Sequence, residues 1–129
     1  MNKLLLDTHA LVWLAAGVKL GPQTLRHISE ADVVLVSALS IFELRLKAAT
    51  GKFPEAEVII SSISTMSLEV LNFTEWHTEA YKIFNSLNKD PYDNALVSVA
   101  IAESVPLVTA DRVILSLKIK GLRSVSASA

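Results

Sequence analysis

The chain has 129 residues, no cysteine and a formal net charge of −1. The length predicts a single domain over residues 1–129, which can bury enough surface to fold without a cross-link. The lack of cysteine excludes disulfides, thiolate zinc sites and a cysteine nucleophile. The near-neutral charge excludes a broad basic surface, so any binding of nucleic acid must depend on a local site.

The amino-terminal residues are too polar for a secretion signal, because Asp7 and His9 interrupt the apolar run that follows Lys3. No apolar run is long enough to cross a bilayer. We therefore expect a soluble, cytoplasmic protein without membrane contact. Apolar residues nevertheless make up 51% of the chain, which indicates a large core or an apolar surface that binds a partner.

Short apolar runs alternate with segments of helical periodicity along the chain. The runs are rich in Val and Leu and do not alternate with polar residues, which is typical of parallel strands buried on both faces. The alternation predicts an α/β fold with a central parallel sheet. The predicted strands are Lys3–Leu6, Val33–Val36, Leu68–Leu71, Pro106–Val108 and the less apolar Leu122–Val125. The predicted helices are Thr8–Ala16, Pro22–Glu30, Ala38–Thr50, Pro54–Thr65, Thr74–Leu87 and Pro91–Ser104.

Four acidic residues fall near the carboxyl ends of the predicted strands. Asp7 directly follows the first strand, Glu43 follows the second, and Asp111 follows the fourth. Asp93 lies in the first turn of the helix predicted from Pro91. Ligands of open α/β sheets bind beyond the carboxyl ends of the strands, so we expect the four carboxylates to converge there.

Each acid also has a structural interpretation, which the residues alone leave open. Asp7 and Asp111 could cap the helices that follow them. Asp90 and Pro91 have the pattern of an N-cap and first helical residue, which would place Asp93 in a helical turn that favours acids.

Glu43 could form a capping box with Ser40, or an ion pair with Lys47 one turn later. Four such structural roles need not all fall at one edge of the sheet, which favours a functional site. If the four acids converge, they cannot all stay ionised without a cation. Oxygen ligands without cysteine or clustered histidine select Mg²⁺ or Mn²⁺, which can activate water and offset charge on a phosphate.

Several neighbouring residues could support such a site. Thr8 and Thr109 flank acids and could orient them or be ordinary loop hydroxyls. His9 has the simpler interpretation of a structural or surface histidine. The basic side chains that could contact an RNA backbone are Lys47, Lys52 and Arg112.

Three segments, LLLDTHALVW, SALSIFELRLKAATGKF and DPYDNALVSVAIAESVPLVTAD, resemble the successive motifs of PIN domains, specifically of VapC-type toxins of bacterial toxin–antitoxin pairs. The resemblance implies a PIN-like three-layer α/β/α fold with a central parallel sheet and a Mg²⁺- or Mn²⁺-dependent endoribonuclease. It maps the acidic site, both catalytic and metal-binding, onto Asp7, Glu43, Asp93 and Asp111. Relatives often have a histidine and a basic residue where this chain has Asn88 and Asn94; neither position is a predicted metal ligand.

The same resemblance implies a toxin that hydrolyses phosphodiester bonds of structured RNA, with transfer RNA as the expected class. It also implies a small antitoxin partner and a homodimer. A catalytically silent PIN-like module that binds RNA or protein remains an alternative. A phosphotransfer protein is disfavoured, because aspartate-nucleophile phosphatases have an acid two residues after the nucleophile, where this chain has His9.

Overall fold

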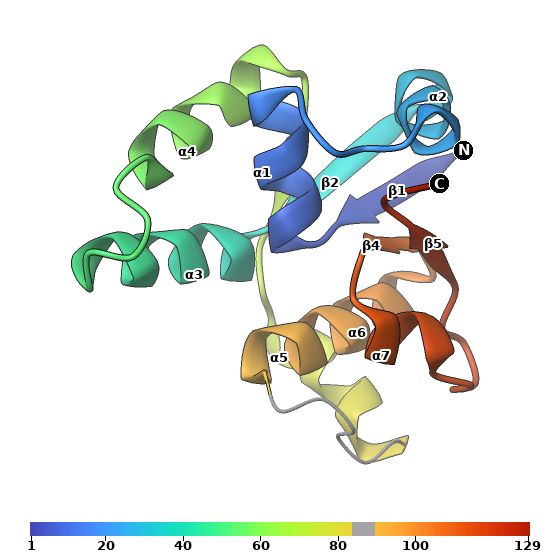
Figure 1. Cartoon of the computed structure of the whole chain (residues 1–129). Coiled ribbons are helices and arrows are strands. Elements are labelled where there is room, and N and C mark those ends of the chain that lie inside the picture. Colours follow the sequence, from blue (N-terminus) through green and yellow to red (C-terminus); the bar gives the residue numbers. More distant parts are fainter. Residues whose placement is uncertain (84–89) are drawn as a thin grey trace.

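The computed structural model of the chain describes residues 1–83 and 90–129. Its centre is a five-stranded parallel sheet with the strand order β3-β2-β1-β4-β5 (Figure 1). The strands are β1 (Lys3–Leu6), β2 (Val33–Ser37), β3 (Glu69–Leu71), β4 (Leu107–Thr109) and β5 (Ser124–Ser126). The predicted parallel sheet is confirmed, although β5 begins two residues later than predicted.

Helices cover both faces of the sheet. Residues of α1 and α4 join one buried cluster, and residues of α6 and α7 join a second cluster on the other face. The predicted three-layer α/β/α architecture is therefore confirmed. The helices are α1 (Thr8–Ala16), α2 (Pro22–Glu30), α3 (Ala38–Ala49), α4 (Ala56–Thr65), α5 (Glu75–Thr78), the 3₁₀ helix η1 (Glu79–Ile83), α6 (Pro91–Glu103) and α7 (Arg112–Ser116).

The two apolar faces of the central strands β1, β2 and β4 explain why these strands are buried on both sides. Successive side chains of a strand point to opposite faces. In β1, Leu4 and Leu6 join the cluster under α1 and α4, whereas Leu5 joins the cluster under α6 and α7. In β4, Val108 joins the cluster under α1 and α4, and Leu107 joins the cluster under α6 and α7.

The predicted single helix Thr74–Leu87 is wrong over its described part, which forms α5 followed by η1. Residues 84–87 of that prediction, and Asn88, lie outside the described residues. His77 is buried, its Nδ1 accepts a 3.0 Å hydrogen bond from the Thr74 N–H, and its Nε2 lies 2.8 Å from Glu103 Oε2. The contact with Glu103 ties this segment to α6.

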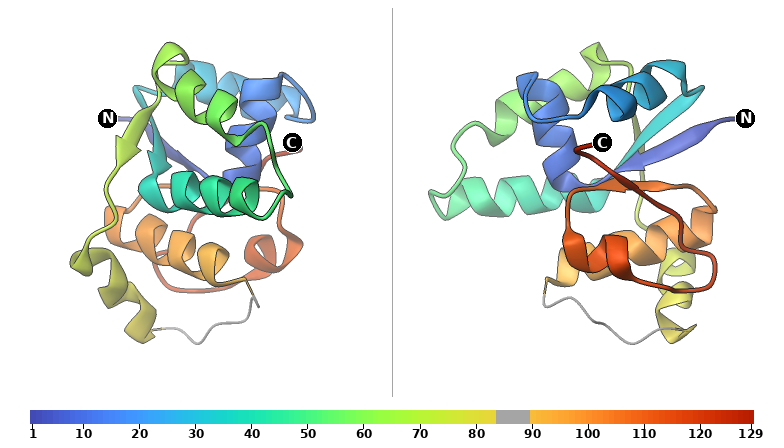
Figure 2. Two further views of the ribbon diagram at one scale, coloured as in Figure 1. Left: turned by 90° about the vertical axis from the view of Figure 1, so that its left-hand side faces the viewer. Right: turned by 45° about the vertical axis from the view of Figure 1, so that its right-hand side comes forward.

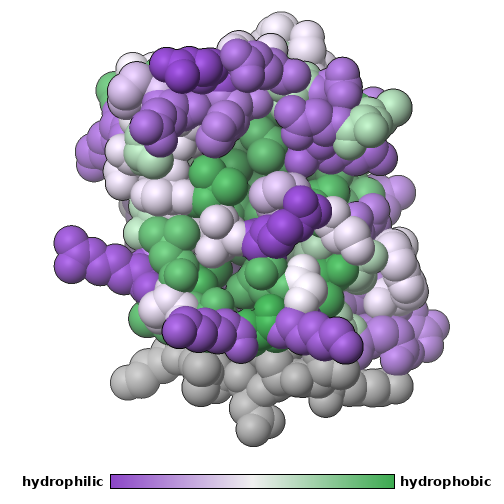
Figure 3. All heavy atoms as spheres, turned by 90° about the vertical axis from the view of Figure 1, so that its right-hand side faces the viewer, coloured by the Kyte–Doolittle hydropathy of each residue, from purple (hydrophilic) through white to green (hydrophobic). Residues whose placement is uncertain are grey.

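The residues that follow β5 pair with the start of α2. The N–H of Gly21 donates to Ala127 O over 2.9 Å, and the N–H of Gln23 donates to Ala129 O over 3.0 Å. A Cβ atom on Gly21 would overlap the backbone of Ala129, so this approach requires glycine. Figure 3 shows the right-hand side of Figure 1, where patches of apolar side chains lie between polar ones. None of the described helices combines the length and apolar character needed to span a membrane.

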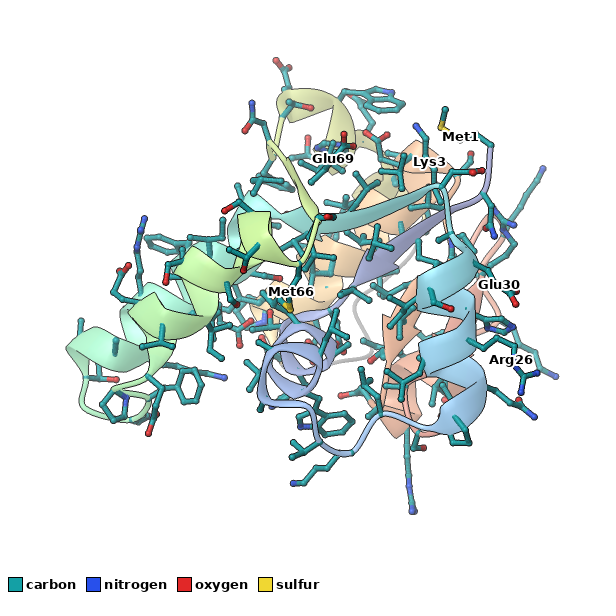
Figure 4. All side chains as sticks on the ribbon, turned by 90° about the horizontal axis from the view of Figure 1, so that it is seen from above. Met1, Lys3, Arg26, Glu30, Met66 and Glu69 are labelled. Carbon is teal, nitrogen blue, oxygen red and sulfur yellow. The ribbon has the colours of Figure 1, made fainter. Side chains whose placement is uncertain are left out.

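The sheet has chemically different ends. Lys3 and Glu69 begin β1 and β3 at the amino ends of the strands (Figure 4). At the carboxyl ends, the chain leaves β1 through Asp7 and leaves β4 through Asp111. β1 and β4 are neighbours where the strand order changes direction, which is the position at which open α/β sheets bind ligands.

Candidate active site

Asp7 lies at the junction of β1 and α1. Its backbone N–H donates to Val108 O over 3.0 Å, which ties it to β4, and its Oδ1 accepts a 2.7 Å hydrogen bond from the Ala10 N–H. The predicted helix cap is therefore confirmed. Burial raises the pKa of Asp7, although hydrogen bonds from Thr109 and Ala10 oppose the rise. The ionised carboxylate is thus held in a place where its charge is poorly solvated.

Glu43 is brought to the same end by α3, which begins where β2 stops. Its Oε1 accepts a 2.6 Å hydrogen bond from the Thr8 hydroxyl, and its Oε2 lies 3.0 Å from Lys47 Nζ. The predicted ion pair with Lys47 is therefore confirmed. The negative charge of Glu43 adds to the rise in the pKa of Asp7.

The predicted capping box of Ser40 and Glu43 is wrong, because α3 begins earlier than that pattern requires. Ser37 is the N-cap, and its hydroxyl accepts a 3.1 Å hydrogen bond from the Leu39 N–H. Ser40 is instead buried inside the helix, with its Oγ 2.9 Å from the Thr8 hydroxyl. Ser40 and Glu43 thus share Thr8 as a neighbour across two helices.

Asp93 is carried by the first turn of α6. Asp90 caps this helix through a 2.9 Å hydrogen bond from the Tyr92 N–H, and Pro91 is the first helical residue, as predicted. Burial raises the pKa of Asp93 to about 7, and negative charges contribute to the rise. In decreasing order of effect these charges are those of Asp90, Asp111, Asp7 and Glu43. The four predicted acids therefore lie close enough for their charges to interact.

Asp111 caps α7, since its Oδ1 accepts a 3.0 Å hydrogen bond from the Ile114 N–H. Thr109, the last residue of β4, connects two of the acids. Its side chain donates to Asp7, and its Oγ1 accepts a 3.0 Å hydrogen bond from the Asp111 N–H. Asp7 and Asp111 are thus helix caps and members of the acid cluster at the same time.

The donor set of this cluster fits a hard divalent cation. It consists of carboxylates. Burial is the main cause of the raised pKa values of Asp7 and Asp93, neighbouring carboxylates add to both rises, and a bound cation would favour the ionised forms. Across residues 1–83 and 90–129, no three acidic or histidine side chains are close enough to hold one ion together. Magnesium in proteins is commonly bound by one or two carboxylates, several waters and substrate phosphates, which an open acid cluster can accommodate.

Basic side chains flank the acids on one side. A pocket of about 300 Å³ is lined by Thr8, His9 and Phe53 together with Lys47 and Lys52. Lys47 connects this pocket to the acid cluster through its ion pair with Glu43. His9 is exposed, as expected for a surface histidine, and Arg112 is exposed at the first residue of α7.

Two aromatic residues at this end of the sheet were not predicted from the sequence. The rings of Phe42 on α3 and Tyr92 on α6 lie 6.3 Å apart between their centroids and are tilted by 44°. Each residue directly precedes an acid of the cluster, Glu43 or Asp93. That shared position was the signal in the sequence that could have identified the pair.

The comparisons with known proteins agree with this architecture. Residues 4–120 match the PIN domain, so the chain belongs to the PIN domain family. The sequence resemblance to this family is thereby confirmed. No curated protein sequence matches the chain.

Solved structures with a similar fold include VapBC complexes. The chain superimposes on a chain of VapBC2 from Rickettsia felis, bound to a DNA fragment from its promoter, with a TM-score of 0.74, 20% identity and coverage of 96% of this chain and 98% of the other. For DNA-bound VapBC from Salmonella typhimurium the TM-score is 0.72 and the identity 18%, with coverage of 98% of each chain. For VapC20 of Mycobacterium tuberculosis, a toxin that cleaves the sarcin-ricin loop, the TM-score is 0.56 and the identity 13%, with coverage of 81% of this chain and 86% of the other.

Proposed function

We propose that this protein is the toxin of a VapC-type toxin–antitoxin pair and that its acid cluster hydrolyses RNA with Mg²⁺ or Mn²⁺. The observation that carries the proposal is the electrostatic coupling of Asp93 to Asp7, Glu43 and Asp111 at the carboxyl ends of the strands of a PIN domain. The structural similarity to VapC20, which cleaves an RNA loop, supports the choice of RNA.

In the proposed reaction the chain supplies ligands and orientation. Asp7 and Asp93, whose pKa values are raised, are the carboxylates that benefit most from a bound cation. Thr109 holds Asp7 and Asp111 together, and Thr8 holds Glu43. When bound, Mg²⁺ would act as a Lewis acid that promotes water activation and offsets charge on the phosphate.

The bond changes define the products. The oxygen of a water molecule bonds to phosphorus and the water gives up a proton to solvent. The bond from phosphorus to the 3′ oxygen breaks, and the 3′ oxygen takes up a proton from solvent. The products are a 5′-phosphate and a 3′-hydroxyl, and the 2′-hydroxyl takes no part. Lys47 and Lys52 lie where they could approach neighbouring phosphates.

The partners follow from the same proposal. A cluster of carboxylates favours a basic side chain of a small antitoxin, which would pair with the acids and exclude the metal. The similar VapBC structures are complexes, which supports such a partner. A homodimer is also proposed, because exposed apolar side chains occur on β3, α5 and the loop between them, namely Val70, Phe73 and Trp76.

A catalytically silent PIN-like binding module is the second candidate. It is favoured by the engagement of both oxygens of Glu43, with Thr8 and with Lys47, which leaves this carboxylate less open to a metal. Calorimetric titration of Mn²⁺ into the wild type and into Asp7→Asn separates the two candidates. The ribonuclease binds the metal and loses affinity in the variant, whereas the silent module binds none in either form.

The end groups of the RNA fragments test the proposed reaction. The purified protein is incubated with transfer RNA and with folded ribosomal RNA fragments in Mg²⁺. Degradation of the downstream fragment by a 5′-phosphate-dependent exonuclease supports the proposal, because the cleavage creates the 5′ end of that fragment alone. Fragments that end in a 2′,3′-cyclic phosphate would contradict it, because those products require attack by the 2′-hydroxyl.

A further inference from the structure

Phe42 and Tyr92 form an exposed aromatic pair between two helices of the acid cluster. Figure 2 shows α3 and α6 running side by side, and the two rings meet across them with 6.3 Å between centroids. Phe42 is 60% exposed, and Tyr92 is half-buried. Within the described part of the chain neither ring belongs to a buried apolar cluster, so packing of the core does not explain the pair.

The pair is placed by the same turns of helix that place two acids. Phe42 precedes Glu43 on α3, and Tyr92 precedes Asp93 on α6. Successive residues of a helix point about 100° apart, so each ring points in a different direction from its acid. Glu43 is 4% exposed whereas Phe42 is 60% exposed, which agrees with this geometry. An exposed aromatic surface therefore lies on the helical turns that supply Glu43 and Asp93.

We propose that Phe42 and Tyr92 form a stacking site for one unpaired nucleobase of the RNA, next to the phosphate held at the acid cluster. This inference rests on the proposed ribonuclease function. Proteins that recognise single-stranded RNA stack splayed bases on aromatic side chains. The net charge of −1 gives little general attraction for phosphates, so stacking can supply affinity that charge does not.

A nucleobase fits this pair better than an apolar side chain of a protein partner, because RNA joins each base to a phosphate, and each ring is on the residue before an acid of the cluster. Every base has a flat face, so the site selects an unpaired nucleotide and tolerates different sequences. The substrate class is therefore RNA with a single-stranded segment or loop at the cleaved bond, in which the base is already free of its duplex.

Binding of a fluorescent base analogue tests the proposal directly. The probe is an eight-nucleotide oligouridine RNA in which 2-aminopurine, a base whose fluorescence is quenched by stacking, replaces each position in turn. Asp7→Asn protein in Mg²⁺ is used so that the RNA is not cut. We expect quenching to be strongest at one position. Phe42→Ala in the same background should abolish that maximum and weaken binding about tenfold, within the range of stacking one base.

Matched variants separate stacking from a general loss of apolar surface. Leu46→Ala removes an exposed apolar side chain from the same helix, one turn later, and should leave the quenching unchanged. Phe42→Trp keeps a ring and should quench, whereas Phe42→Leu should not. In the active protein, Phe42→Ala should raise KM more than it lowers kcat, because the ring binds RNA without touching the reacting atoms.

The outcomes distinguish this inference from the function on which it rests. If wild-type protein cleaves RNA while Phe42→Ala shows the same quenching and KM, the stacking site is refuted and the ribonuclease stands. If Phe42→Ala binds RNA normally but loses only an antitoxin, the pair is a protein contact and the inference is wrong. If wild-type protein neither binds nor cleaves RNA, both proposals fail together.

Discussion

The hydroxyl of Thr8 donates a 2.6 Å hydrogen bond to Oε1 of Glu43 and so joins the first turn of α1 to the middle of α3. Both residues are buried. A buried carboxylate oxygen that loses its donor keeps the cost of its desolvation. This contact therefore supports both the packing of the two helices and the position of Glu43 in the acid cluster.

Thr8→Val removes the hydroxyl at nearly constant volume and should lower the free energy of unfolding by about 1–3 kcal/mol. RNA cleavage should also decrease, because Glu43 loses one of the two contacts that hold it. Chemical denaturation and initial cleavage rates measure the two effects. Thr8→Ser retains the hydroxyl and serves as the control; equal losses in both variants would assign the effect to packing.

The pKa of Asp93 near 7 predicts that the metal-free protein loses stability as pH rises. In the unfolded chain this group titrates near its ordinary value of 3.8, so the folded state binds more protons between about pH 4 and pH 7. The stabilising effect of the proton is complete below that window and is lost as pH passes 7. Asp7, whose pKa is also raised, acts in the same direction.

Thermal unfolding in EDTA between pH 4.5 and pH 8 measures this dependence. Asp93→Asn should reduce the loss of unfolding free energy between pH 4.5 and pH 8. The reduction should be on the order of 1 kcal/mol, because solvent screens a half-buried group. Asp32→Asn changes an exposed acid before β2 and should keep the wild-type slope. An identical slope in wild type and Asp93→Asn would show that the acid cluster does not carry the effect.

Divalent metal should stabilise the folded protein, because it binds the cluster and offsets the charges that raise the pKa of Asp93. At pH 7.5, millimolar Mg²⁺ or Mn²⁺ should raise the Tm of the wild type by several degrees. The double variant Asp7→Asn and Asp93→Asn should have a higher Tm in EDTA and a much smaller response to metal. The same response in both proteins would place the bound metal elsewhere.

The exposed apolar side chains near the β3 edge of the sheet predict a dimer in solution. Trp76 is 55% exposed, and Val70 on β3 is 47% exposed. Trp76→Glu should shift light scattering from dimer to monomer without changing the circular dichroism. Val58→Glu on α4, where the side chain is 69% exposed, tests a second exposed apolar position. A wild-type monomer at high micromolar concentration would contradict the proposal.

Much of the fold was predictable because strand and helix patterns are local. The bounds of β1, α1 and α2 match their predictions, since each of these elements starts or ends at a clear cap or apolar run. The segment from Thr74 was mispredicted because a long-range contact, His77 with Glu103, governs it. Single-sequence periodicity contains no information about such a partner.

The acid cluster was also predictable, because parallel strands bring residues at their carboxyl ends together. What the sequence could not give was the set of partners of each carboxylate. Asp7 serves as both helix cap and cluster member, so the structural and functional interpretations of the residue were not alternatives. The link through Thr109 depends on the pairing of β1 with β4, which the sequence leaves undetermined.

The dependence of RNA cleavage on metal and on two carboxylates tests the central claim most directly. Initial rates on a folded RNA are measured against Mg²⁺ concentration for wild type, Asp7→Asn, Asp93→Asn and the control Asp32→Asn. Asparagine can also cap α1, so Asp7→Asn should stay folded. The account predicts cleavage that requires Mg²⁺, falls at least a hundredfold in Asp7→Asn and Asp93→Asn, and persists in Asp32→Asn. Full cleavage in EDTA, or by Asp7→Asn and Asp93→Asn combined, would contradict it.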